Sequence, residues 1–328
     1  MAICAVQPHA DMYGLGIRIA FYLQWLGTLW FNYVDQTALP DLRLLGLCLS
    51  GSMTLVLLME SLDTALDAAE MYVMTVLATG AHMFLVPVYI WRLVAGCRCY
   101  WDPSYWMEEE PLRIYRVVNF VTMVAGTCVA VWFFAAHLPG LEDGCQQYGF
   151  IFGELSMKNW GFIVLNSMLH AAVLVVCVVI LLAKLGRKVK RGSIRRRRRR
   201  RRENYNHVRR LATIQVFSDC VVWAMLVATV ELAITYNNLS GANGVNSVAQ
   251  LLALLASIGT CLRAYWLHAV DNGAKVYDRD DIAQNYGWPM TYEDWWTLAE
   301  YQQAMDIARD NERWSRHWRR QIRRAYRG

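Results

Sequence analysis

The sequence predicts an all-α polytopic membrane protein, a bundle of about seven transmembrane helices followed by a cytoplasmic helical tail. Three observations lead to this prediction. Hydrophobic residues make up 56% of the chain, above the roughly 45–50% of an average globular protein. Several segments contain the roughly 20 apolar residues that a helix needs to cross about 30 Å of hydrocarbon. Finally, an unbroken run of arginines from Arg195 to Arg202 lies between two such segments, and it cannot cross the membrane at low cost.

Seven segments are apolar enough to span, at residues 14–34, 42–59, 71–95, 114–137, 160–185, 211–236 and 246–268. Backbone groups in lipid must be paired within their own segment, so spans this apolar are helices; the strands of a membrane barrel are shorter and alternate. The segment 42–59 is the shortest, and its small residues Gly46, Ser50 and Gly51 favour close packing on a neighbour. Without it the chain would have six spans and a cytoplasmic amino terminus.

The distribution of Lys and Arg predicts the orientation. With seven spans, the loop at 96–112, the basic loop at 186–210 and the chain after 269 fall on one side of the membrane. The connecting segments on the other side contain a single Lys or Arg, which is Lys158. Because basic loops stay in the cytoplasm, we expect the amino terminus outside and the carboxyl terminus inside, with the plasma membrane as the location.

The chain is expected to divide into a transmembrane domain, 1–270, and a cytoplasmic amphipathic tail, 271–328. Apolar and aromatic residues recur at every fourth position of the tail, at Trp314, Trp318, Ile322 and Tyr326, within a basic collar. The predicted lipid-facing residues are Trp314, Trp318, Arg319, Arg320 and Arg323. This pattern suits an anionic leaflet, so we expect the tail and the run from Arg195 to Arg202 to bind inner-leaflet lipids. A calmodulin-like protein groove is the alternative partner for the tail. Nucleic acid is not an expected partner, because the basic runs that bind nucleic acid usually belong to soluble proteins.

Charged side chains inside the spans are costly, so each is a functional candidate with an expected partner. Arg18 and Glu231 lie about five residues from the outer ends of their spans, and these matched depths predict an ion pair. Asp219 and Arg263 lie within roughly one helical turn of each other in depth, which predicts a second pair.

Two histidines, His82 and His170, fall near mid-membrane. Two interpretations are open for these histidines. They are neutral and hydrogen-bond across the bundle, or they form a proton relay. Pro87 lies one turn beyond His82 and predicts a kink in that span.

Most of the 9 cysteines lie in spans or in a cytoplasmic loop, so no disulfide framework is expected. Only Cys4 and Cys145 face the outside, where a disulfide and two unpaired thiols are both open. Asn238 begins an Asn-Leu-Ser sequon in an external loop and is a candidate glycosylation site.

Motifs of soluble enzymes are missing from the sequence, which has no G-x-S-x-G, H-E-x-x-H or phosphate-binding glycine loop and no CxxC pair. We therefore expect no enzyme, cofactor or metal. Intramembrane catalysis by scattered His and Asp residues is the alternative.

Three stretches carry a resemblance: residues 13–25 (YGLGIRIAFYLQW), residues 86–93 (VPVYIWRL) with the Cys97 and Tyr100–Pro103 region after them, and residues 145–150 (CQQYGF). They resemble uncharacterised multipass membrane proteins of filamentous fungi, over roughly the first two-thirds of the chain. The resemblance implies an origin and no activity.

Seven spans in this orientation favour a receptor or sensor by analogy of architecture, with no ligand indicated. The motifs of rhodopsin-like receptors are missing, because Trp91-Arg92-Leu93 stands where an acidic-Arg-aromatic triplet would be expected. The alternative is an ion channel or proton-coupled transporter that uses the six intramembrane residues as a polar path. A polar cavity open to both sides would favour transport, and a pocket at the outer end only would favour sensing.

Overall fold

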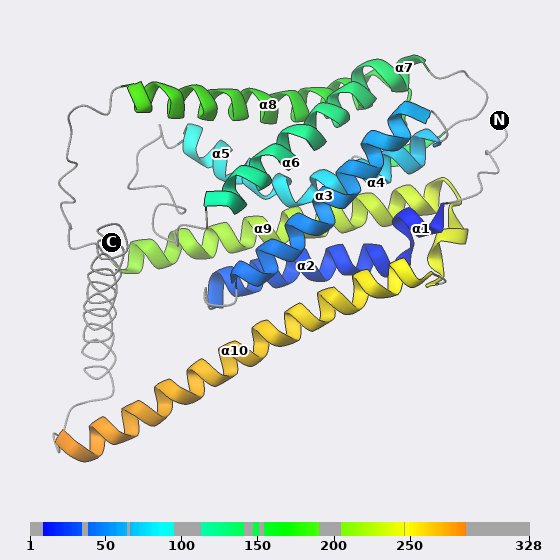
Figure 1. The fold of residues 1–328 in the computed structure, drawn as a ribbon. Coiled ribbons are helices and arrows are strands. Elements are labelled where there is room, and N and C mark those ends of the chain that lie inside the picture. Colours follow the sequence, from blue (N-terminus) through cyan, green and yellow to red (C-terminus); the bar gives the residue numbers. More distant parts are fainter. Residues whose placement is uncertain are drawn as a thin grey trace, which may run out of the picture. The chain divides into compact units, whose positions relative to one another are not determined.

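The computed structural model describes residues 9–34, 39–63, 66–94, 113–140, 147–150, 154–189, 205–245 and 247–286. These residues form the helices α1 (Ala10–Tyr13), α2 (Leu15–Val34), α3 (Leu39–Asp63), α4 (Ala68–Met83), α5 (Leu85–Val94), α6 (Arg113–Trp132), α7 (Leu138–Gly140), α8 (Trp160–Val189), α9 (Tyr205–Tyr236) and α10 (Val248–Tyr286) (Figure 1). A π-helical turn, η3 (Phe133–His137), joins α6 to α7, and a 3-10 turn, η4 (Ser240–Asn243), follows α9.

Five of the helices in the described part of the chain are long and apolar enough to cross a membrane. They are Leu39–Ser61 in α3, Ile114–Gly140 across α6 and α7, Trp160–Val179 in α8, Thr213–Tyr236 in α9 and Val248–Ala269 in α10. The bent pair α4 and α5 makes a sixth if it counts as one span. The chain therefore fits an all-α multi-pass membrane protein. Helix α2 is not among these helices, since Arg18, Gln24 and Asn32 lower its mean hydropathy, and the seventh span stays a prediction.

The shortest predicted span, within α3, packs closely on its neighbours through small residues. Gly46 faces α2 so closely that a Cβ there would lie 3.2 Å from Nε2 of Gln24. On the other side, the Ser50 hydroxyl donates to the carbonyl of Ala78 in α4 at 2.5 Å. The missing side-chain bulk lets α3 lie between α2 and α4.

The kink predicted at Pro87 is present, because α4 and α5 meet at a bend of 47°. Pro87 has no N–H to donate to the carbonyl of Met83, and its ring crowds that carbonyl. The regular helix accordingly ends at Met83, and α5 begins at Leu85 after the turn at Phe84.

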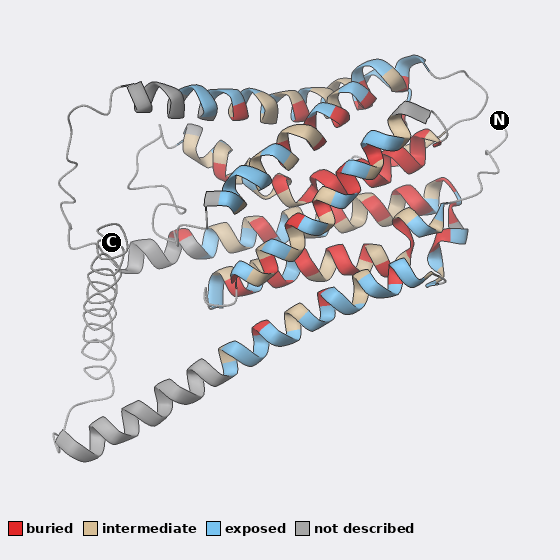
Figure 2. Cartoon of the chain, in the orientation of Figure 1, coloured by how far each residue is buried: buried red, intermediate tan, exposed pale blue. Residues whose placement is uncertain are grey.

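Buried side chains concentrate in α4 and on the facing sides of α2 and α9, while few of the described side chains of α8 and α10 are buried (Figure 2). In the core, Tyr72 of α4 packs edge-on against Phe134 and Phe162. The outer surfaces carry large apolar side chains such as Phe217 and Trp266, exposed at 72% and 69%. A soluble protein rarely exposes so much apolar surface, which suits contact with lipid tails.

One feature departs from the all-α prediction. Strands β1 (Tyr148–Phe150) and β2 (Glu154–Ser156) pair antiparallel, with Gly149 opposite Leu155. The side chain of Asn237, just after α9, accepts from the Tyr148 N–H at 2.8 Å and donates to its carbonyl at 2.7 Å. These bonds satisfy the outer edge of β1, so a hairpin forms in a segment too short to fold alone.

The hairpin, α1, η4 and the start of α4 gather at one end of the bundle, which we call the α1 end (Figure 1). The Ala69 N–H donates to the Gln147 side chain at 2.8 Å, and thereby joins the start of α4 to the hairpin.

The chain forms two compact units, Met1–Ala269 and Val270–Gly328. Helix α10 continues through residue 269 to Tyr286, well past the predicted end of the last span at residue 268. The helix start predicted at residue 291 and the tail residues Trp314, Trp318, Arg319, Arg320 and Arg323 lie outside the described residues, as does the run from Arg195 to Arg202.

Candidate functional site

Arg18, in the first turns of α2, lies at the centre of a polar cluster at the α1 end. Its side chain is fully buried, and Nη1 lies 2.5 Å from Oε2 of Glu231 on α9. Its Nη2 donates to the side chain of Asn243 at 2.8 Å and to the carbonyl of Ala242 at 3.3 Å. The Tyr22 hydroxyl donates to the other oxygen of Glu231 at 2.8 Å. The matched depths of Arg18 and Glu231 thus correspond to a direct contact, which ties α2 to α9 and η4.

A second polar cluster at the same end surrounds Glu70, which sequence reasoning assigned to a connecting loop. Glu70 lies in the first turn of α4 and is 1% exposed. Its Oε1 accepts from the Tyr13 hydroxyl at 2.7 Å and from the backbone N–H of His9 at 2.9 Å. The His9 ring nitrogen Nδ1 lies 3.2 Å from Oε2. The signal that could have revealed it is the Asp67-Ala-Ala-Glu70 spacing before an apolar run, a helix-start pattern that places the acid at the positive end of the helix.

Protonation at this cluster is shifted by burial. Burial and the hydrogen bond to Glu70 raise the pKa of Tyr13, which therefore remains a donor at physiological pH. Burial raises the pKa of Asp67 above its usual range, and the nearby carboxylate of Glu70 adds to the effect, while a hydrogen bond from Gln147 opposes it.

The Asp67 shift predicts a stability change with pH. Because its folded-state pKa is raised, protonation favours the folded state, and this contribution is lost as pH rises through the raised pKa. Asp67→Asn should therefore raise the free energy of unfolding at neutral pH by at most about 1 kcal/mol, because the carboxyl is only partly buried, and the melting temperature should rise with it. The gain should vanish on acidification through the raised pKa. Melting curves across pH test this, with Glu154→Gln on exposed β2 as the control; a gain independent of pH would contradict it.

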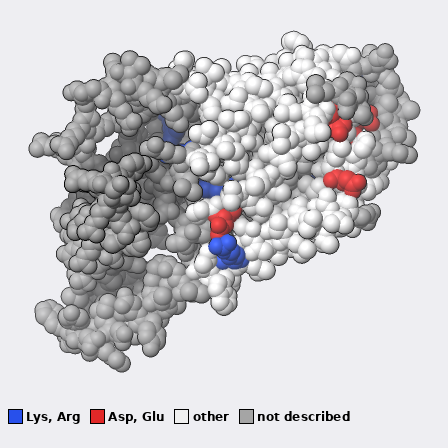
Figure 3. Space-filling view, viewed as in Figure 1, with Lys and Arg blue, Asp and Glu red and all other residues white. Residues whose placement is uncertain are grey.

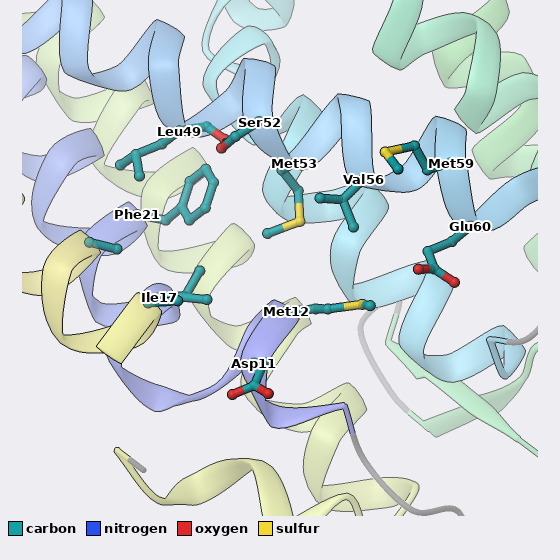
Figure 4. Close-up of a pocket in the computed structure, with 12 residues that line it drawn as sticks. Asp11, Met12, Ile17, Phe21, Leu49, Ser52, Met53, Val56, Met59 and Glu60 are labelled. Atoms are coloured by element: carbon teal, nitrogen blue, oxygen red, sulfur yellow. The ribbon is translucent and has the colours of Figure 1, made fainter. Parts of the chain in front are cut away.

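A cavity of about 380 Å³ opens between α3 and the first two helices, and we call it the α3 groove (Figure 4). Side chains of α3 form one side of it and those of α1 and α2 the other, with two alanines of α10 completing the lining. The lining residues are Asp11, Met12, Ile17, Phe21, Leu49, Ser52, Met53, Val56, Met59, Glu60, Ala249 and Ala253. The groove is apolar except for Ser52 and the two carboxylates. Asp11 and Glu60 belong to the α1 end, since α1 lies there and α3 ends there.

The six intramembrane candidates do not share this groove, because none of them lines it. Arg18 and Glu231 lie together in the cluster described above. His82 and His170 are buried, with Nε2 of each lacking a hydrogen-bond partner; His170 bonds the Asn166 carbonyl through Nδ1 and stacks on Phe134.

The predicted pair of Asp219 and Arg263 is wrong. Arg263 of α10 lies 3.3 Å from the carboxylate of Asp41 at the start of α3, and Asp219 is buried elsewhere, beside Pro87 in a smaller cavity. Depth along two helices does not fix how each is rotated about its axis, and here α10 turns its arginine toward α3.

Asn238 is exposed in the turn after α9 and adopts a positive φ of 53°, which asparagine tolerates. Cys4 and Cys145 lie outside the described residues. Within the described ranges, Cys48, Cys128, Cys177, Cys220 and Cys261 are free thiols. No group of three or more His, Cys, Asp or Glu side chains that could hold a metal occurs among the residues with a described position.

Comparison with protein-family models finds no match. Comparisons with curated proteins and with solved structures find none either. The resemblance to fungal membrane proteins therefore stays a prediction, and function is inferred from the geometry alone.

Proposed function

We propose that this protein is a multi-pass membrane receptor or sensor that binds a cationic amphiphile in the α3 groove. One observation carries the proposal: an apolar cavity of ligand size lies at the α1 end and has carboxylates as its only charged lining residues. Its volume of about 380 Å³ falls within the roughly 300–1,000 Å³ of small-molecule sites.

The groove's charge selects the head group of the ligand. Asp11 and Glu60 both contribute to the lining, and no Lys, Arg or His side chain does. A cationic head would be attracted to the exposed Asp11 and the half-buried Glu60, whereas an anionic head would be repelled.

The walls select the tail. Met12, Met53 and Met59 contribute flexible thioether side chains, which adapt to an irregular alkyl chain. Met59 is 67% exposed, on a helix that also exposes Leu55 to lipid at 63%, so the groove adjoins the lipid-facing surface. An amphiphile could therefore enter from the bilayer.

The proposed orientation places the α1 end outside the cell and the carboxyl terminus in the cytoplasm, most simply in the plasma membrane. On the face in view, two groups of acidic side chains lie at the α1 end, and the basic side chains lie toward the opposite end, where one further acidic group is beside them (Figure 3). This asymmetry supports basic-side-inside insertion. Tags at the two ends should accordingly differ in protease protection.

The proposal predicts selective binding in nanodiscs of a long-chain alkylammonium probe that carries a fluorophore at its tail. Glu60→Gln should weaken binding roughly tenfold, or about 1.4 kcal/mol, because it removes one counter-charge. Ser52→Trp should block binding, since it fills the groove from an exposed position. Fluorescence titration of the probe measures both effects.

Two controls lie nearby. Leu55→Trp places the same side chain on the exposed face of α3, and Glu154→Gln removes a carboxylate from the same end of the bundle; both should bind like the wild type. Equal binding of an alkyl sulfate with the same tail, or normal binding by Ser52→Trp, would contradict the proposal.

A cation channel or proton-coupled transporter is the second candidate function. One observation favours it: the buried carboxylate of Asp219 lies beside the broken helix α4–α5. Broken helices at buried ionisable groups are a common arrangement in transporters.

A further inference from the structure

Asp219 is a buried carboxylate in a membrane-spanning helix. It lies six residues inside the apolar stretch that starts at Thr213 of α9, roughly 9 Å along the helix axis. Only 6% of its surface is exposed. An ionised carboxylate at such a site costs several kcal/mol unless something neutralises it.

Hydrogen bonds within the protein leave one carboxylate oxygen of Asp219 without a donor. The side-chain amide of Gln215, one turn earlier, donates to the carboxylate. Oδ1 of Asp219 and Oε1 of Gln215 have no hydrogen-bond partner. Two buried acceptor oxygens therefore lie on one helix without a donor, and each such orphan costs about 1–3 kcal/mol.

Gln215 and Asp219 line a cavity of about 50 Å³ between α9 and α5. Pro87 and Trp91 line it from α5, and Ser218 adds a hydroxyl beside Gln215 and Asp219. The space is large enough for a water molecule or a small ion. Carboxylate, amide and hydroxyl oxygens are the ligands of hard cations.

The ion pairs found between described residues do not include Asp219. Arg92 of α5 lies over the ring of Tyr89, with 5.5 Å between the guanidinium carbon and the ring centroid. Ion pairs between described residues join Arg18 to Glu231, Arg263 to Asp41 and His9 to Glu70, and none includes Asp219. Several other titratable side chains have described positions on the neighbouring elements, and none of them lines the cavity: Glu70, Tyr72 and His82 on α4, Tyr89 on α5, and Cys220, Glu231 and Tyr236 on α9.

We propose that Asp219 and Gln215 bind a small monovalent cation, either Na⁺ or a proton, in the cavity beside the α4–α5 bend. Because Pro87 of the broken helix forms a wall of this cavity, the cation's presence and the angle between α4 and α5 are coupled. The site is separate from the α3 groove, with which it shares no lining residue, and the inference does not rest on the receptor proposal.

Labelling of the full-length wild-type protein in nanodiscs with dicyclohexylcarbodiimide tests the proposal, because this apolar reagent modifies protonated carboxyl groups in membranes. Mass spectrometry measures the rate of modification at Asp219 across pH, in NaCl and in choline chloride. If the cation is Na⁺, labelling should fall about tenfold when Na⁺ reaches ten times its dissociation constant. If it is a proton, labelling should ignore Na⁺ and fall roughly tenfold for each pH unit above the midpoint.

Variants separate this site from other carboxyl groups. Asp219→Asn should remove the label, and Gln215→Leu, which keeps the carboxylate, should weaken protection by Na⁺ or shift the midpoint in pH. Glu231, which is paired with Arg18, serves as the internal control and should not respond to Na⁺. Labelling of Asp219 that ignores both pH and Na⁺, or its absence under every condition, would overturn the proposal, whatever the result of ligand binding in the α3 groove.

Discussion

Glu231→Ala should destabilise the bundle by about 3–5 kcal/mol, because it leaves the guanidinium of Arg18 buried with neutral acceptors only. Arg18 is fully buried, whereas the Glu231 side chain is 39% exposed and also accepts from Tyr22 at 2.8 Å. Arg18→Ala should therefore cost less, roughly 1–3 kcal/mol. The double variant should be milder than the sum of the single ones. Unfolding of the detergent-solubilised protein measures all four states of this double-mutant cycle.

The exposed pair of Arg263 and Asp41 provides a matched control at the opposite end of the bundle. Its side chains are 67% and 40% exposed, and the charged atoms lie 3.3 Å apart. The same cycle there should give a coupling energy below about 1 kcal/mol. Strict additivity of Arg18→Ala and Glu231→Ala would show that the buried contact does not stabilise the fold.

Gly80→Val should strongly destabilise the packing between α4 and α2. A Cβ at residue 80 would lie 2.5 Å from Cζ2 and 2.7 Å from Cη2 of Trp25, which is too close for any real contact. Trp25 is itself held by Phe21 and Phe84, with ring centroids 5.8 Å and 6.4 Å away. Even Gly80→Ala must displace the indole, at about 1–3 kcal/mol, and Gly80→Val should cost more.

Gly259 of α10 is the matched control, since a Cβ there meets no atom within 4 Å. Gly259→Ala should leave the melting temperature unchanged or raise it slightly, because alanine is the better helix former by about 1 kcal/mol. A similar loss of stability in both alanine variants would refute the packing argument at Gly80.

Much of the local architecture could be predicted from the sequence. The helices at α3, α6, α8, α9 and α10 follow from long apolar runs, and the bend between α4 and α5 follows from Pro87. The pairing of strands β1 and β2 could not be predicted, because it depends on Asn237, which is distant in the chain, to satisfy the backbone of Tyr148. Propensity within so short a segment carries little information.

Contacts in the candidate site could be predicted only where the depth of two residues along their helices was enough to identify them as partners. Arg18 and Glu231 meet because both depth and rotation agree, whereas Arg263 agrees with Asp219 in depth and yet contacts Asp41. Glu70 escaped notice because a carboxylate at a span boundary looks exposed in sequence, and only folding of His9 and Tyr13 over it buries it.

The sequence by itself determined that this chain is apolar enough for a membrane, where most of its helices run and where one of them bends. Each of these properties depends on the transfer free energy or backbone preference of residues near one another in the chain. Only the tertiary structure decided which polar groups meet, that the α3 groove has an acidic, apolar lining, and that Asp219 keeps an unpaired oxygen beside Pro87. Those features depend on the rotation and spacing of whole helices, which are set by packing between residues far apart in sequence.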